Sequence, residues 1–427
     1  MEELGINAAG GSNVAGQGAP PPAACAPRSP SLRKQLSPLR DEGSSSPTIV
    51  LTPVVEAPFD EPIAPLPPLA PSLQPLPEDQ PLTEDEEDED IADVQEVETV
   101  ASAFDRVPPR PSRESSSSRY SPLPWQGHFD EDKMVAIPDS DDIFHVYLAG
   151  TEGPVVFCLH GGGYTGLSFA LIAGKMKEKV RVVAMDMRGH GQSKTSDDTD
   201  LSAETQCQDV LNVVSAMYGR EPPAIILIGH SMGGAIAVRV AAKRALPTLA
   251  GLVVIDVVEG TAMASLVHMQ RILANRQLHF PSVEKAIEWS VRGGGSLQNP
   301  ESARISVPST LKFDADRKCY VWLTALEESE AHWRGWYEGL SEVFLSCPVP
   351  KLLLLAGTDR LDRSLTIGQM QGKFQMIVVR HTGHAIQEDE PDEFAGVVLN
   401  FIARNRIGTY GIEIPGLRRP VSLRSSN

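Results

Sequence analysis

A serine flanked by glycines lies near the middle of the chain, in the pattern Gly-x-Ser-x-Gly at Gly229-His230-Ser231-Met232-Gly233. An apolar run, "AIILIGH" (224–230), precedes the serine, and a helix-like stretch (232–245) follows it. A sharp turn from a strand into a helix strains the serine backbone and leaves no room for bulky neighbours, which explains the glycines. This context predicts that Ser231 is a nucleophile whose hydroxyl stands clear of a sheet edge.

A serine hydroxyl is a poor nucleophile at its own pKa, so Ser231 needs a general base. In the α/β-hydrolase fold, which a strand–serine–helix turn indicates, the chain order is serine, then acid, then histidine. His384 follows the last predicted strand and is the favoured base, with His381 at the strand end as the lesser candidate. His160 precedes the serine, so we expect it to brace its loop.

Two aspartates compete for the role of the acid that orients the histidine. Asp256 ends the apolar run in "LVVIDVVEG", and Asp359 follows the run in "LLLLAGTDRLD". Either carboxylate can hold the imidazole tautomer and stabilise the imidazolium. Position alone favours Asp359, because the strand just before the last is the commoner place for this acid. Asp186 also ends a strand but precedes Ser231, which indicates a structural role.

An oxyanion formed from an ester needs backbone N–H donors. One donor is expected at Met232, the residue after the nucleophile, and the other in "LHGGGYTG" (159–166), which follows the first central strand. Glycines in that loop let the backbone approach a substrate oxygen closely. We expect Gly162 to be the second donor, with Gly163 the next candidate.

The elements that must position these residues alternate between strands and helices from residue 130 onward. Short apolar runs typical of buried parallel strands occur at 154–160, 181–186, 224–230, 250–256, 351–357 and 375–380. Helical periodicity lies between them at 201–219, with Ser202 as N-cap, and at 232–245, 282–291 and 391–405. This alternation predicts an α/β fold, an α/β-hydrolase with a mostly parallel central sheet and helices on both faces.

One long stretch interrupts the alternation. The 94 residues between Asp256 and Lys351 hold four of the five tryptophans. Because this stretch is far longer than a crossover helix and begins where a strand ends, we expect a helical cap at about 257–350, inserted between the last strands, over the carboxyl edge of the sheet.

The first part of the chain has a different composition. Its first 120 residues contain 20 of the 35 prolines, and with 21 acidic and 8 basic residues they carry −13 of the net charge of −18. Such a segment buries too little apolar surface to offset its ordering entropy. We therefore expect a disordered Pro/Ser/acid-rich head at 1–118, a hydrolase domain at 119–410 and a C-terminal tail at 411–427.

Composition also limits the cofactors and partners that we expect. The five cysteines are scattered without a CxxC pair, which disfavours a zinc site or a disulfide framework. No basic face for nucleic acid, membrane-spanning run or signal peptide is evident in the sequence. We expect no cofactor, no nucleic-acid or membrane partner, and a cytoplasmic location, with entry into the nucleus left open.

Several longer motifs resemble the protein phosphatase methylesterase family. They are "LIGHSMGGAIAV", "VVIDVVEGTAM", "AIEWSV", "FLSCPVPKLLLLAG", "DRLD", "LTIGQMQGKFQM" and "GHAIQEDEPD". The resemblance runs from about residue 120 to about 405 and covers both the elbow and the expected cap, while the head lies outside it. It implies a serine esterase that removes the methyl ester from the C-terminal leucine of the protein phosphatase 2A catalytic subunit, its expected partner.

The resemblance implies a triad of Ser231, Asp256 and His384, and so overrules the positional preference for Asp359. It also implies an acyl-enzyme intermediate and the release of methanol, chemistry that requires no metal or organic cofactor. Trp333, Trp336 and Met370 are candidates for gripping a peptide tail, although tryptophans in such a place are equally typical of core. The long acidic insert that some members carry is short here, near 307–318.

Two other functions remain open from the sequence. One is a small-molecule esterase or acyltransferase on the same scaffold, and the other is a non-catalytic protein that masks the phosphatase tail. Dehalogenases and epoxide hydrolases carry an aspartate at the elbow, so Ser231 disfavours them. The presence of serine, acid and histidine together disfavours the non-catalytic function.

Overall fold

A computed structural model describes residues 119–292, 297–357 and 361–413. The expected head (1–118), Asp359 and most of the expected C-terminal tail lie outside the described residues. The boundary expected after residue 410 falls within a two-stranded hairpin, in which β12 (Ile407–Gly408) pairs with β13 (Gly411–Ile412). Strands of two residues are too short to produce a periodic sequence signal.

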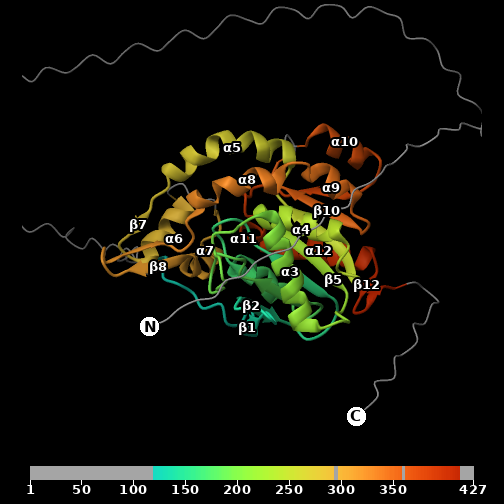
Figure 1. The fold of residues 1–427 in the computed structure, drawn as a ribbon, viewed down its shortest axis with the longest axis horizontal. Helices are drawn as coiled ribbons and strands as arrows, with labels where there is room; N and C mark the ends of the chain where they lie inside the picture. The colour runs from blue at the N-terminus through green and yellow to red at the C-terminus, as the bar shows by residue number, and fades with distance from the viewer. Residues whose placement is uncertain (1–118, 293–296, 358–360, 414–427) are drawn as a thin grey trace, which may run out of the picture. The chain divides into compact units, whose positions relative to one another are not determined.

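The main sheet has eight strands in the order β1-β2-β4-β3-β5-β6-β10-β11 (Figure 1). β1 and β2 pair antiparallel to their neighbours, and the other six strands are parallel, as the apolar runs predict. The strands are β1 (Glu131–Ala136), β2 (Ile143–Ala149), β3 (Val155–Leu159), β4 (Arg181–Met185), β5 (Ile225–His230), β6 (Leu249–Ile255), β10 (Lys351–Leu355) and β11 (Gln375–Val378).

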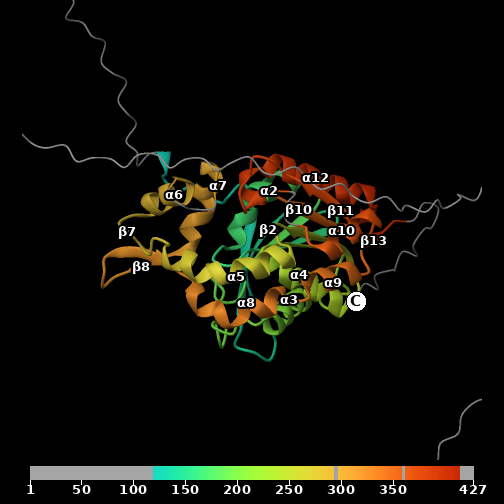
Figure 2. The same cartoon turned by 90° about the horizontal axis from the view of Figure 1, so that it is seen from above.

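Helices cover both faces of this sheet (Figure 2). On one face lie α3 (Ala203–Tyr218), α4 (Met232–Lys243) and α9 (Leu340–Ser346), and on the other lie α2 (Ala170–Met176) and α12 (Pro391–Arg404). The Ser202 hydroxyl accepts a hydrogen bond from the Thr205 N–H, which confirms the predicted N-cap of α3.

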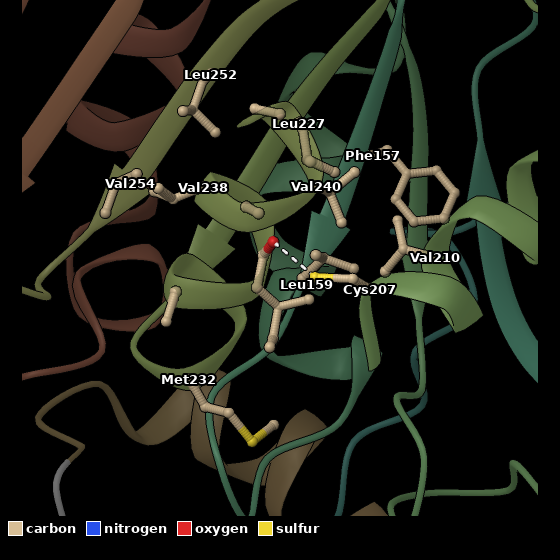
Figure 3. Packing of buried hydrophobic residues seen from close by; sticks show 14 of the residues in the cluster. Phe157, Leu159, Cys207, Val210, Leu227, Met232, Val238, Val240, Leu252 and Val254 are labelled. Atoms are coloured by element: carbon tan, nitrogen blue, oxygen red, sulfur yellow. Dashed lines mark hydrogen bonds between the residues drawn. The ribbon is translucent and has the colours of Figure 1, made fainter. Parts of the chain in front are cut away.

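The alternation of side chains along each strand divides the core into two layers. In β3, Phe157 and Leu159 pack with α3 and α4, whereas Val156 and Cys158 belong to the layer beneath α2 and α12. Figure 3 shows the first layer, in which strand residues meet the side chains of the two helices. Because both faces are covered, the central strands are apolar throughout, and they form a rigid base for the loops at their carboxyl ends.

The insertion between β6 and β10 contains more than the expected helices. A three-stranded antiparallel sheet in the order β7-β9-β8 accompanies them, and α5 and α8 run side by side (Figures 1 and 2). Its helices are α5 (Glu259–Ala274), α6 (Val283–Arg292), α7 (Pro300–Ser306) and α8 (Glu330–Tyr337), with α9; the 3-10 turns are η2 (Val307–Thr310) and η3 (Leu326–Ser329); and its strands are β7 (His279–Phe280), β8 (Leu311–Asp314) and β9 (Cys319–Trp322).

The remaining elements flank the carboxyl end of the main sheet. They are the 3-10 turn η1 (Gly166–Phe169), α10 (Arg363–Met370) and α11 (Ile386–Asp389). No helix within the described ranges combines the length and apolar character needed to cross a bilayer.

Candidate active site

Ser231 lies at the turn where β5 ends and α4 begins, with φ 50° and ψ −115°. This left-handed φ is strained for a residue with a side chain, as expected of a nucleophile elbow. A Cβ at Gly229 would lie 2.2 Å from the Gly233 carbonyl oxygen, and a Cβ at Gly233 would lie 2.4 Å from the Leu159 carbonyl oxygen. Only glycine fits at these two positions, which is the physical reason for the motif.

Asp256 follows β6 and holds His384. Its Oδ2 lies 2.8 Å from His384 Nδ1, and its Oδ1 accepts a hydrogen bond of 3.0 Å from the Ala356 N–H. The Asp256 side chain is fully buried, whereas the His384 side chain is 40% exposed. With Nδ1–H donated to the carboxylate, Nε2 of His384 is left to accept a proton.

The loop that carries His384 is held from two sides. His230, the last residue of β5, donates from Nε2 to the His384 carbonyl oxygen at 2.9 Å. The Asp389 carboxylate of α11 accepts hydrogen bonds from the Gly383 N–H at 2.8 Å and from the Gln298 N–H at 2.7 Å. The position of His384 therefore depends on both the sheet and the insertion.

Ser231 and His384 line the same cavity, whose volume is about 610 Å³. Among the described side chains, no hydrogen bond joins the Ser231 hydroxyl to His384; the serine instead makes a polar contact with the Tyr337 hydroxyl of α8. Burial raises the pKa of Tyr337 to about 12, and the contact with Ser231 works in the opposite direction. Catalytic hydrogen bonds are often loose in unliganded enzymes and tighten when substrate binds.

The glycine loop after β3 runs beside the elbow. A Cβ at Gly161 would lie 3.4 Å from Ser231 Cβ, and one at Gly162 would lie 3.9 Å from the Met232 sulfur. Gly162 and Met232 both line the cavity with Ser231. The two residues expected to donate to the oxyanion thus lie in the wall of the cavity that contains Ser231, and their role stays a prediction.

Two buried histidines brace this loop. His160 Nε2 accepts from the Met187 N–H at 2.9 Å, and its Nδ1 lies 2.8 Å from the Gly161 carbonyl oxygen. His190 Nε2 accepts from the Gly163 N–H at 3.0 Å. Burial lowers the pKa of both imidazoles, that of His160 well below 6.5, so each is neutral at pH 7. This geometry agrees with the bracing role expected for His160.

The other candidates have mixed outcomes. Trp333 and Trp336 line the cavity, and their indole N–H groups donate to Ser329 Oγ and to the Leu201 carbonyl oxygen. Met370, the third candidate for gripping a peptide, projects from α10 with 83% of its surface exposed and is not among the described residues that line the cavity. Helical periodicity does not reveal which face of a helix meets a cavity.

Three polar candidates are not among the described residues that line the cavity with Ser231. His381 is exposed at a left-handed φ of 61°, and Asp359 lies outside the described residues. Asp186 is fully buried, where its carboxylate accepts hydrogen bonds from the Gly166 and Gln192 N–H groups and contacts His145. Within the described ranges, no group of three or more His, Cys, Asp or Glu side chains is placed to hold a metal ion.

Sequence reasoning missed Tyr337 and His190. Tyr337 lies in the insertion, where no strand or motif marks the residues that turn towards the serine. His190 lies in "MRGHGQS", directly after a predicted strand and between two glycines. That spacing was the available signal, because polar residues at the carboxyl ends of parallel strands gather at one edge of the sheet.

Comparisons with known proteins agree with this geometry. A family model described as "Alpha/beta hydrolase family" matches residues 155–397. The chain is 46% identical over 346 residues to protein phosphatase methylesterase 1 of Mus musculus, across 70% of this chain and 89% of the relative. It is 40% identical over 317 residues to protein phosphatase methylesterase 1 of Yarrowia lipolytica, across 68% of this chain and 74% of the relative.

The fold is also found among solved structures. E-2-(acetamidomethylene)succinate hydrolase superimposes with a TM-score of 0.53 at 20% identity, covering 64% of this chain and 99% of that chain. At that identity the likeness concerns the fold alone. The sequence relatives, in contrast, bear on the activity.

Proposed function

The chain belongs to the alpha/beta hydrolase family and, within it, to the protein phosphatase methylesterases, and on this premise we propose that it removes the methyl ester from the C-terminal leucine of the protein phosphatase 2A catalytic subunit. The chain is a carboxylic ester hydrolase. The identity of the substrate and the route through an acyl-enzyme are the proposed parts.

The observation that carries the proposal is the pairing of Asp256 with His384, 2.8 Å apart, beside a serine at a strained elbow in the same cavity. A buried carboxylate that receives Nδ1–H fixes the tautomer in which Nε2 is basic. In the proposed reaction, Nε2 of His384 takes the hydroxyl proton of Ser231 as its oxygen attacks the ester carbonyl carbon.

The tetrahedral intermediate carries its negative charge on the former carbonyl oxygen. We assign the N–H groups of Met232 and Gly162 as the donors to this oxygen. The intermediate collapses when methoxide leaves and takes the proton from His384 as methanol. Water then attacks the acyl-serine with His384 as the base, and the free carboxylate and the Ser231 hydroxyl are restored.

The shape of the cavity supports a peptide substrate. About 610 Å³ is within the range of sites that enclose a drug-sized ligand, so there is room for more than one terminal residue. Side chains of the insertion such as Leu266, Trp333 and Leu326 form much of the lining, and they are suited to hold an apolar leucine side chain.

The proposal is tested with a phosphatase 2A catalytic subunit that carries the methyl ester and with its tail peptide. Mass spectrometry after incubation with the wild-type chain should show loss of one methyl group, and Ser231→Ala should abolish this loss. Ser346→Ala, at an exposed position on α9, is the matched control and should act like the wild type. Demethylation that persists in Ser231→Ala refutes the proposal, and turnover of short-chain esters without any demethylation favours a small-molecule esterase.

A further inference from the structure

Arg276 follows α5 and lines the cavity that contains Ser231 and His384. Apart from His384, the described residues around this cavity include no other side chain that can carry a charge at pH 7. The rest of the lining combines apolar side chains, chiefly leucine and tryptophan, with neutral polar ones such as Ser290, Ser306 and Thr310. The guanidinium of Arg276 has no role in the reaction proposed for Ser231 and His384.

The Arg276 guanidinium lies over an aromatic ring. It stacks on Trp322 of β9, with its central carbon 3.7 Å from the ring centroid. The Trp322 indole N–H donates to the Gln277 carbonyl oxygen at 2.8 Å, which sets the orientation of the ring. A planar guanidinium that lies on an aromatic face keeps its N–H groups free to donate to a partner at its edge, in the plane of the guanidinium.

No acceptor within the described residues takes a hydrogen bond from the Arg276 side chain. The contrast is Arg188, whose guanidinium donates to both oxygens of Asp209 at 2.8 and 2.6 Å. Burial lowers the pKa of Arg276 to about 10, so it remains charged at pH 7 while being partly removed from water. A partly desolvated cation without a bonded partner gains free energy when an anion binds.

We propose that Arg276 binds a carboxylate of the phosphatase tail in the active-site cavity, an inference that rests on the proposed function. The carboxylate has two possible sources: an acidic side chain upstream of the terminal leucine, or the α-carboxylate that hydrolysis creates. The ester substrate itself has no terminal charge, so in the first case Arg276 selects the substrate, and in the second it retains the product.

The test uses the full chain and short peptides that end in leucine methyl ester. Each peptide carries a single glutamate at a different position upstream of the leucine, and a matched peptide carries glutamine at the same position. If an acidic side chain is the source, Arg276→Gln should lower kcat/KM for the preferred glutamate peptide by about 10- to 100-fold, the range for a charge-assisted hydrogen bond, and leave the glutamine peptide nearly unchanged. If the product carboxylate is the source, kcat/KM for both ester peptides should stay nearly unchanged. Arg276→Lys should recover part of the loss. Arg271→Gln, at an exposed position in the last turn of α5, is the control and should act like the wild type.

Binding to the Ser231→Ala variant, measured by calorimetry, separates the two sources and does not depend on turnover. If Arg276 binds an acidic side chain, Arg276→Gln weakens the binding of the glutamate ester and does not change the binding of the glutamine peptides. If Arg276 binds the product carboxylate, Arg276→Gln weakens the binding of the glutamine peptide that ends in the free acid and does not change the binding of its methyl ester. If Arg276→Gln weakens the binding of every peptide equally, or of none, the inference is overturned. If binding depends on Arg276 but the wild type does not hydrolyse the ester, only the proposed function is overturned.

Discussion

Glu388 should make the folded chain less stable as the pH rises through 7. This residue of α11 is fully buried, and its Oε2 accepts hydrogen bonds from Ser302 and Ser306 at 2.8 and 2.7 Å. Its Oε1 has no hydrogen-bond partner among the described atoms. Burial raises the pKa of Glu388 to about 7, against the serine hydrogen bonds, and the neighbouring Asp389 raises it further.

The sign of the effect follows from the two pKa values. Because the folded chain holds the proton more tightly than an unfolded chain with a pKa of 4.5, the contribution to stability is complete below pH 4.5 and is lost as the pH rises through about 7. The full difference is about 3 kcal/mol. Between pH 6 and pH 8 the wild type should lose about 1 kcal/mol of unfolding free energy from this residue.

Glu388→Gln removes the titration and keeps an oxygen that can accept from the serines. Urea unfolding of the wild type and the variant at pH 6 and pH 8 measures the difference, and the variant should gain about 1 kcal/mol relative to the wild type at the higher pH. Glu393→Gln, at an exposed position on α12, is the control and should keep the wild-type dependence on pH. An unchanged dependence on pH in Glu388→Gln refutes the reasoning.

Two further predictions concern the catalytic geometry. Asp256→Asn should lower kcat by about 10⁴-fold with little loss of stability, because an amide can still accept the Ala356 N–H but does not favour the required tautomer of His384. Ester-hydrolysis assays of Asp256→Asn and Asp359→Asn decide which aspartate is the acid. A larger loss of kcat in Asp359→Asn contradicts the assignment of Asp256. Gly161→Ala places a Cβ 2.8 Å from His230 Nδ1 and 3.4 Å from Ser231 Cβ, so the loop must shift relative to the serine. Steady-state kinetics should show a fall in kcat of about 10²-fold. An unchanged kcat would mean that the loop does not position the reacting groups.

The sequence was sufficient to place the parallel strands of the main sheet and the elbow that carries Ser231. The continuous apolar runs mark strands buried on both faces, and each of the six runs assigned to parallel strands forms one in the sheet. The elbow was equally clear, since steric exclusion at Gly229 and Gly233 leaves little choice of residue. These features are local, so a short window of sequence contains the physics that determines them.

The choice between Asp256 and Asp359 shows where local information ends. Both follow apolar strands, and position alone favours Asp359, which lies outside the described residues. The resemblance to a family points to Asp256, whose carboxylate lies 2.8 Å from His384 Nδ1. The outcome depends on how the loop after β11 folds back over the sheet edge, held by His230 and Asp389. No sequence period encodes such contacts between distant segments.

The insertion was the least predictable part for the same reason. Its strands have two to four residues, too few for an alternating pattern, and they pair across turns of the insertion itself. Tyr337 contacts Ser231 because α8 packs over the elbow. The residues that line the cavity from the insertion therefore had to come from the structure.

The histidines around the elbow differ in a way that leaves a single candidate for the base in the proposed reaction. His160, His190 and His230 are fully enclosed, and burial lowers the pKa of each. Nε2 of His160 and Nε2 of His190 each accept a hydrogen bond from a backbone N–H, and Nε2–H of His230 donates to the His384 carbonyl oxygen. Each of these rings is therefore held neutral in one tautomer. His384 alone combines a carboxylate on one nitrogen with exposure to the cavity on the other side. In the proposed reaction, a proton released by Ser231 therefore has one favourable acceptor, and the other imidazoles hold the loops that surround it.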